Sequence, residues 1–185
     1  MMGSLQYAGA VADYRRYWMP VRFYTIAARV LHSGRYGGDA EDPRLFPQYL
    51  GYPSLVRGYD VGTFDAADCP QTPTTTCDAF DRLIGSRMLV ANLELRVPLL
   101  RLFGQTSRPY GPVPVEVAAF ADAGVTWSRG QSPDFFGGAR KPVRSTGAAL
   151  RVNVFGFSVL QLSAAHPFDR PRGGWIYQFS LTPGF

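Results

Sequence analysis

Hydrophobic and polar residues alternate along several stretches of this chain, each about ten residues long, the length that a tilted strand needs to cross a bilayer. In the clearest stretch, 86–98, Leu93 and Leu95 flank Glu94, which points to the opposite face. Side chains change face at every residue of a β-strand, so this period of two predicts strands. The predicted strands are 4–13, 21–33, 86–98, 115–127, 143–154, 158–165 and 175–185.

The composition favours a membrane barrel over a soluble β-sandwich. The chain holds 13 Phe, 10 Tyr, 20 Gly and 15 Pro, but only 18% charged residues. It has no apolar run of the roughly 18 residues that a transmembrane helix needs. We therefore predict an all-β, antiparallel portion of a transmembrane barrel, with a soluble sandwich as the less favoured alternative. Charged residues on the more polar strand faces would then line the lumen: Arg29, Glu94, Arg96, Glu116, Asp122 and Arg151.

The charged residues and histidines give no sign of nucleic-acid binding or catalysis. The net charge of +5 comes almost wholly from arginine, and no basic run is longer than the pair at 15–16, so nucleic acid is not an expected partner. His32 and His166 lie near different strand ends. The sequence holds no hydrolase, zinc-protease or nucleotide-binding motif. We expect neither an enzyme nor a bound metal or cofactor.

A long connection at about 34–85 separates the second and third predicted strands. It is rich in Gly, Pro, Asp and Thr, and connections of this length in a compact domain are usually functional or disordered. The other predicted connections are 14–20, 99–112, 128–142, 155–156 and 168–174. They alternate short and long as in outer-membrane barrels, except that 99–112 is longer than this pattern predicts.

Three motifs follow one another along the chain. The long connection contains Val56, Arg57, Gly58 and Tyr59; one predicted strand places Phe120, Asp122 and Gly124 at alternate positions; the last strand carries Trp175, Tyr177, Phe179 and Phe185. Together they resemble the C-terminal barrel of the BamA/TamA family of outer-membrane assembly proteins, also called the bacterial surface antigen family. The three motifs are similar to its lumen-folded Val-Arg-Gly-Phe/Tyr loop, its Phe-x-Asp-x-Gly strand and its C-terminal β-signal.

The resemblance implies a role for the loop arginine. It implies that Arg57 folds into the lumen and pairs with acidic groups on the barrel wall. The candidates are Glu94 and Asp122, which the alternation places on the lumen face of neighbouring strands, within reach of one guanidinium. The alternative interpretation is that both carboxylates simply face lumen water.

Cys69 and Cys77 lie in the same long connection, on the side expected to be extracellular. Their close spacing in a Pro- and Thr-rich segment permits a disulfide, which an oxidising compartment would form. Some members of the family carry a loop disulfide at this place. Free thiols are the alternative, and two cysteines without a third ligand make a poor metal site.

The resemblance also sets the expected function. The family's barrel is sixteen-stranded, so residues 1–185 would be its C-terminal part, completed by strands of the parent barrel. No signal peptide or periplasmic POTRA domain is recognised in the sequence. We expect assembly or insertion of outer-membrane proteins, or polypeptide translocation, in the bacterial outer membrane, with the lipid bilayer and client polypeptides as partners. A passive outer-membrane porin or adhesin is the alternative.

Overall fold

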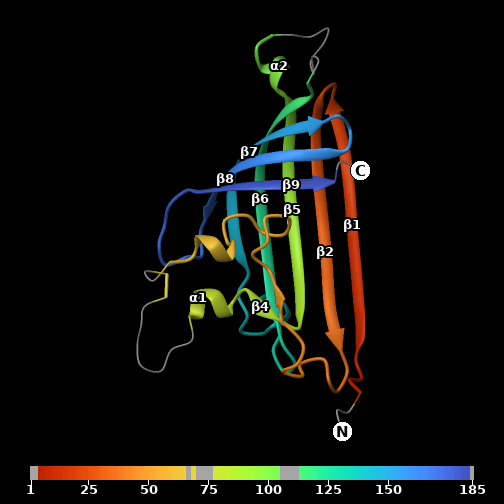
Figure 1. The fold of residues 1–185 in the computed structure, drawn as a ribbon, viewed down its shortest axis with the longest axis vertical. Helices are drawn as coiled ribbons and strands as arrows, with labels where there is room; N and C mark the ends of the chain where they lie inside the picture. The colour runs from red at the N-terminus through yellow and green to blue at the C-terminus, as the bar shows by residue number, and fades with distance from the viewer. Residues whose placement is uncertain (1–3, 66–67, 70–76, 105–112, 184–185) are drawn as a thin grey trace.

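The computed structural model describes residues 4–65, 68–69, 77–104 and 113–183, and confirms the predicted all-β, antiparallel fold. Strands β1-β2-β5-β6-β7-β8-β9 form one antiparallel sheet in that order (Figure 1). These strands are β1 (Ala8–Val21), β2 (Tyr24–Tyr36), β5 (Arg87–Pro98), β6 (Val115–Trp127), β7 (Val143–Val154), β8 (Ser158–Pro167) and β9 (Ile176–Pro183).

Short elements lie in the connections. They are the paired strands β3 (Gln48–Tyr49) and β4 (Ile84–Gly85), the single-turn helices α1 (Asp78–Asp81) and α2 (Leu99–Leu102), and the 3-10 turns η1 (Val61–Thr63) and η2 (Asp134–Phe136). The sequence pattern did not predict them, because elements of two to four residues are too short to show a period. None of the described helices is long and apolar enough to cross a membrane.

The prediction of a strand at 4–13 followed by a turn at 14–20 is wrong. Strand β1 continues to Val21, and the turn into β2 consists of Arg22 and Phe23. The proline and aromatic residues at 17–20 suggested a turn, but β1 is an edge strand of the described sheet. Pro20 is tolerated there, since a missing ladder donor matters little at an edge and the register shifts just before Val21.

The other predicted strands agree better with the structure. The second lies a few residues later than predicted, at Tyr24–Tyr36, because the preceding turn was misplaced. The next four differ by at most two residues at an end. The last predicted strand, 175–185, corresponds to β9; residues 184–185, and with them Phe185 of the predicted β-signal, lie outside the described part of the chain.

The connections between successive strands lie alternately at the two ends of the sheet. The connections 22–23, 99–114 and 155–157 join strands at one end, which we call the short-turn end; its longest connection contains α2. At the long-loop end, the strands are joined by 37–86, 128–142 and 168–175. The first of these folds back along the sheet (Figure 1).

The two faces of the sheet differ in polarity and in what covers them. On the inner face, the long connection and the sheet share a buried apolar cluster of Leu31, Leu50, Val56, Tyr59, Leu83, Met88, Val90 and Val143. On the outer face, Leu93, Leu162 and Phe179 stay about half exposed. A soluble sandwich would bury that apolar face under a second large sheet, and the described residues form only one. The structure therefore does not support the sandwich alternative.

Candidate functional site

The tip of the long connection lies inside the curved sheet. Leu50, Val56 and Tyr59 are almost completely buried against the inner face. Their close approach depends on Gly124 of β6, because a Cβ atom there would lie 2.8 Å from both Leu50 and Val56 side-chain atoms. At the tip, Gly58 has a φ of +89°, a left-handed conformation that favours glycine.

Arg57 joins the loop to two neighbouring strands. Its Nε and Nη2 donate to the two carboxylate oxygens of Asp122 on β6, each at 2.7 Å. Its Nη1 donates to Glu94 Oε1 on β5 at 2.8 Å. Its backbone N–H also donates to Asp122, at 3.2 Å. The structure thus brings the three predicted residues together, in the bidentate geometry for which a guanidinium is suited.

An aromatic ring completes the pocket around the guanidinium. Phe120 lies two residues before Asp122 on the same face of β6, and its ring centroid is 3.5 Å from Arg57 Cζ. Arg57 is 3% exposed and Asp122 is 3% exposed. Buried charges are tolerated only when they are paired and hydrogen-bonded, so removing either partner would leave an uncompensated charge.

Two further arginines contact the other carboxylate. Arg96 Nη2 lies 2.6 Å from Glu94 Oε2, and Arg151 Nη1 lies 3.4 Å from the same oxygen. Asn92, directly opposite Asp122 in the register of β5 and β6, donates to Asp122 at 2.9 Å and to the Leu55 carbonyl at 2.7 Å. The inner face therefore carries one connected polar network rather than an isolated ion pair.

The loop tip is also tied to the last strand. Gly58 N–H donates to Gln178 Oε1 on β9 at 2.6 Å. Tyr59 Oη donates to the Arg144 carbonyl on β7 at 2.8 Å and accepts from the Asp169 N–H at 3.2 Å. The predicted tip tetrapeptide therefore contacts both the middle of the sheet and its C-terminal strands.

Arg170 forms a second anchor that the sequence analysis missed. This residue precedes β9 and is 8% exposed. Its Nη1 donates to the Gly58 carbonyl at 3.1 Å, its Nη2 donates to the Thr63 carbonyl at 2.7 Å, and its guanidinium pairs with Asp68. Its Cζ also lies 4.1 Å from the Phe64 ring centroid. One arginine thus holds several points of the segment 58–68.

The charge of Arg170 sets the ionisation of its partner. Burial on its own would raise the pKa of Asp68, but the hydrogen bond and the positive charge of Arg170 lower that pKa below its ordinary value. The next residue, Cys69, forms a disulfide with Cys77. The ion pair and the disulfide therefore fix adjacent points of the long connection.

Gln178, Arg170 and Asp68 were not predicted as site residues, and only Gln178 lies in a segment with a sequence pattern. Gln178 lies on the polar face of the last predicted strand, so the alternation gave its direction but not its partner. Arg170 and Asp68 lie in connections, where no periodicity gives a direction. Only their contacts in the folded chain identify them.

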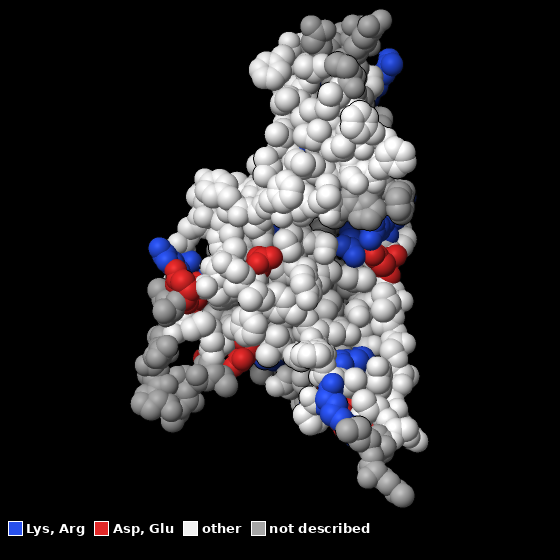
Figure 2. Space-filling model, in the orientation of Figure 1, with Lys and Arg blue, Asp and Glu red and all other residues white. Residues whose placement is uncertain are grey.

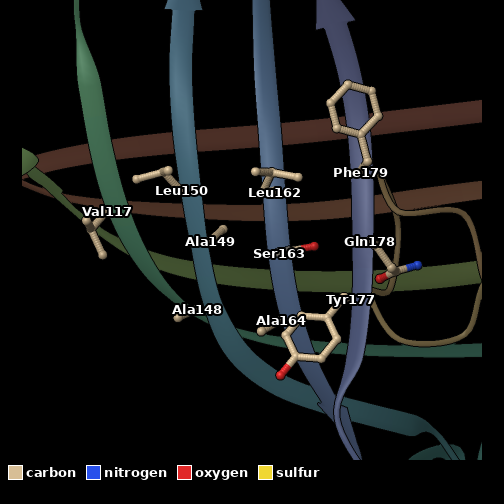
Figure 3. Close-up of a pocket in the computed structure, with 10 residues that line it drawn as sticks. All are labelled: Val117, Ala148, Ala149, Leu150, Leu162, Ser163, Ala164, Tyr177, Gln178 and Phe179. Atoms are coloured by element: carbon tan, nitrogen blue, oxygen red, sulfur yellow. The ribbon is translucent and has the colours of Figure 1, made fainter.

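The aromatic residues of the predicted β-signal point away from this network. Trp175 lies just before β9, and Tyr177 and Phe179 are exposed on the outer face. Tyr177 and Phe179 border a shallow apolar hollow of about 520 Å³ over β6 to β9, whose lining includes Ala148 and Ala164 (Figure 3). An apolar outer face next to an edge strand is suited to lipid contact.

No metal centre is visible among the residues that the structure describes, since no three His, Cys, Asp or Glu side chains are grouped to hold an ion. His32 is held by the Met88 carbonyl at 2.9 Å and the Tyr36 hydroxyl at 2.6 Å. His166 contacts the Gly174 carbonyl at 3.1 Å. Both histidines therefore have hydrogen-bond partners within the protein.

Comparison with known proteins places the chain in a family. The model of the Omp85 superfamily domain matches residues 3–185. No curated protein sequence matches the chain. Because the family match spans almost the whole sequence and the fold is an antiparallel sheet with an apolar outer face, this protein belongs to the Omp85 superfamily of outer-membrane proteins.

Proposed function

We propose that this chain forms part of a barrel that inserts outer-membrane proteins or translocates polypeptides in the bacterial outer membrane. In this proposal, the loop at 50–59 holds the barrel wall in its working conformation. The observation that supports it most strongly is the bridge from Arg57 to Asp122 on β6 and Glu94 on β5.

The contacts suggest how the loop could act on the sheet. Arg57 holds β5 and β6, while Gly58 reaches Gln178 on β9 and Tyr59 reaches the connection before β9. The loop therefore ties the central strands to the C-terminal strand. A shift of the loop would change the position of β9 relative to the wall.

Strand β9 is the element on which a client could act. It is an edge of the described sheet, so one row of its backbone N–H and C=O groups has no partner there. An exposed strand edge can pair with a strand of another chain. We propose that the anchored loop holds this edge in place while parent or client strands pair with it. The mechanism requires no cofactor or nucleotide.

An assembly assay tests this proposal. The full-length protein is reconstituted in vesicles, and the folding of an added barrel client is followed by its heat-modifiable mobility. Arg57→Asp should abolish most of the activity, because it places a third carboxylate beside Glu94 and Asp122. Arg44→Asp is the matched control: Arg44 lies in the same connection, but its partner is the nearby Asp42 at the surface. Equal activity of the two variants would refute the loop's proposed role.

A passive porin remains the second candidate, on the strength of one observation. A cavity of about 610 Å³ on the inner side has several arginines in its lining, among them Arg15, Arg29, Arg96 and Arg151. A porin would show steady ion conductance in planar bilayers and no client folding in the vesicle assay. Client folding that depends on Arg57 would reject this candidate.

A further inference from the structure

The short-turn end of the sheet carries an unusual group of exposed apolar side chains. They lie in α2 and the residues next to it, and in the turn between β7 and β8. Their exposed fractions run from 53% to 91%, for Leu102, Phe103, Val113, Phe155 and Phe157. Large apolar side chains gathered at one end of a molecule mark a contact with a membrane or a partner.

The charges at this end have one sign. Among the described residues of the connections 22–23, 99–104, 113–114 and 155–157, the charged ones are Arg22 and Arg101. Glu116, close to the start of β6, lies opposite Arg151 in the register with β7. In the view of Figure 2, the end that carries α2 shows no acidic atoms.

The opposite end has a different character. Several acidic residues of its connections pair with nearby arginines. The described acidic residues of these connections are Asp39, Glu41, Asp42, Asp60, Asp65, Asp68, Asp78, Asp81, Asp134 and Asp169. The excess of arginine at the short-turn end is therefore local, and does not simply follow from the overall charge of +5.

The two arginines of the short-turn end converge on one aromatic ring. Arg22 Cζ lies 4.8 Å from the ring centroid of Phe23, and Arg101 Cζ lies 5.6 Å from the same centroid. Arg101 is also 5.9 Å from the ring of Tyr24. Within the described part of the chain, neither guanidinium has a hydrogen-bond or ion-pair partner, so their donors remain available to a ligand.

The backbone holds this arrangement in a conformation that bulky residues rarely adopt. Phe23 has a φ of +73°, and Phe155 in the turn between β7 and β8 has a φ of +52°. Glycine would fit both positions more easily. Two phenylalanines with left-handed backbone conformations lie at the same end of the sheet, which suggests that their rings serve a binding contact.

We propose that Arg22 and Arg101, with Phe23 between them, bind the phosphate of an anionic phospholipid at the membrane surface on the short-turn side. The fork of donors on each arginine suits phosphate oxygens, and aromatic rings suit the boundary between headgroups and acyl chains. Leu102 and Phe103 on and beside α2, which projects beyond the strand ends, enter the same boundary (Figure 1). The site is continuous with the apolar outer face and does not depend on the assembly activity.

Lipid retention measured by native mass spectrometry tests the site. The full-length protein is released from micelles containing equal amounts of phosphatidylglycerol and phosphatidylcholine. The wild type should retain phosphatidylglycerol preferentially. The double variant Arg22→Gln/Arg101→Gln should bind it roughly 30-fold more weakly, if each arginine contributes what is typical of a basic residue at an anionic surface.

Two controls make the result specific. Arg82→Gln/Arg129→Gln removes the same charge at the long-loop end and should leave the preference unchanged. Arg22→Lys/Arg101→Lys keeps the charge but loses the paired donors, so it should restore only part of the preference. Equal retention of both lipids by the wild type, or an equal loss in both Gln double variants, would overturn the proposal. Because the readout is lipid binding, a failure here is separate from a failure of the assembly assay.

Discussion

Arg57 and Asp122 are 65 residues apart in the sequence and meet in a bidentate ion pair inside the sheet. The neighbours of Asp122 on the same face of β6 also contact the loop. Phe120 stacks on the Arg57 guanidinium, and Gly124 leaves room for Leu50 and Val56. Alternate positions of β6 thus give the loop an aromatic ring to stack on, a carboxylate to bind, and room for two apolar side chains. This explains why a Phe-x-Asp-x-Gly pattern accompanies a Val-Arg-Gly-Tyr loop.

The space above Gly124 gives the first prediction. In Gly124→Ala, the new methyl group would press on Leu50 and Val56, and we expect the loop to be destabilised by about 1–3 kcal/mol. Trypsin cleavage after Arg57, which is buried in the wild type, should become faster. Gly9→Ala on β1 is the control, because a Cβ atom there meets nothing within 4 Å. Unchanged cleavage in Gly124→Ala would show that the loop tolerates the closer contact.

The second anchor gives the next prediction. Arg170→Met keeps much of the side-chain volume but leaves the buried Asp68 carboxylate without its partner. Breaking a buried pair in this way costs about 3–5 kcal/mol, so the segment 58–65 should exchange its amide hydrogens much faster. Arg172→Met is the matched control, because the side chain of Arg172 is 65% exposed and pairs with Asp65 at the surface. Its effect should stay within about 1 kcal/mol. Similar exchange in both variants would contradict the anchoring role of Arg170.

The lowered pKa of Asp68 predicts how this anchor responds to acid. A carboxyl whose pKa is lower in the folded chain contributes stability that is fully present above its unfolded value of 3.8, and that stability is lost as the pH falls through the lower, folded pKa. After correction for the intrinsic pH dependence of exchange, the protection of the segment 58–65 should therefore not change through Asp68 between pH 5 and 8. In stronger acid this protection should fall. In Asp68→Asn the acid-dependent step should disappear. An identical step in that variant would assign it to another group.

The sequence predicted much of the fold because barrel strands repeat one simple pattern. Alternation located β5 and β6 almost to the residue, and it put Glu94 and Asp122 on the inner face. It failed at β1, where Pro20 and the aromatic residues before it resemble a turn. An edge strand with a register shift accommodates them, and strand alternation does not reveal which strand is an edge.

The candidate site was only partly predictable, for a related reason. Arg57 and its partners were predicted because the loop motif implied an arginine in the lumen, and strand alternation placed Glu94 and Asp122 on the lumen face. Arg170 and Asp68 lie in connections, and their meeting depends on how two loops fold over the sheet. The pairing of Arg22 and Arg101 around Phe23 likewise joins two turns that are far apart in the sequence. Such contacts leave no local signal.

A charge-swap rescue tests the central claim most directly. Client folding is measured for Arg57→Asp alone and for Arg57→Asp combined with Asp122→Arg. The single variant should lose activity, because three carboxylates would meet. The double variant should regain much of it, since the pair is re-formed with reversed charges and Glu94 keeps Arg96 and Arg151. Full activity in the single variant, or no recovery in the double variant, would contradict the claim that the Arg57–Asp122 contact holds the loop in its working position.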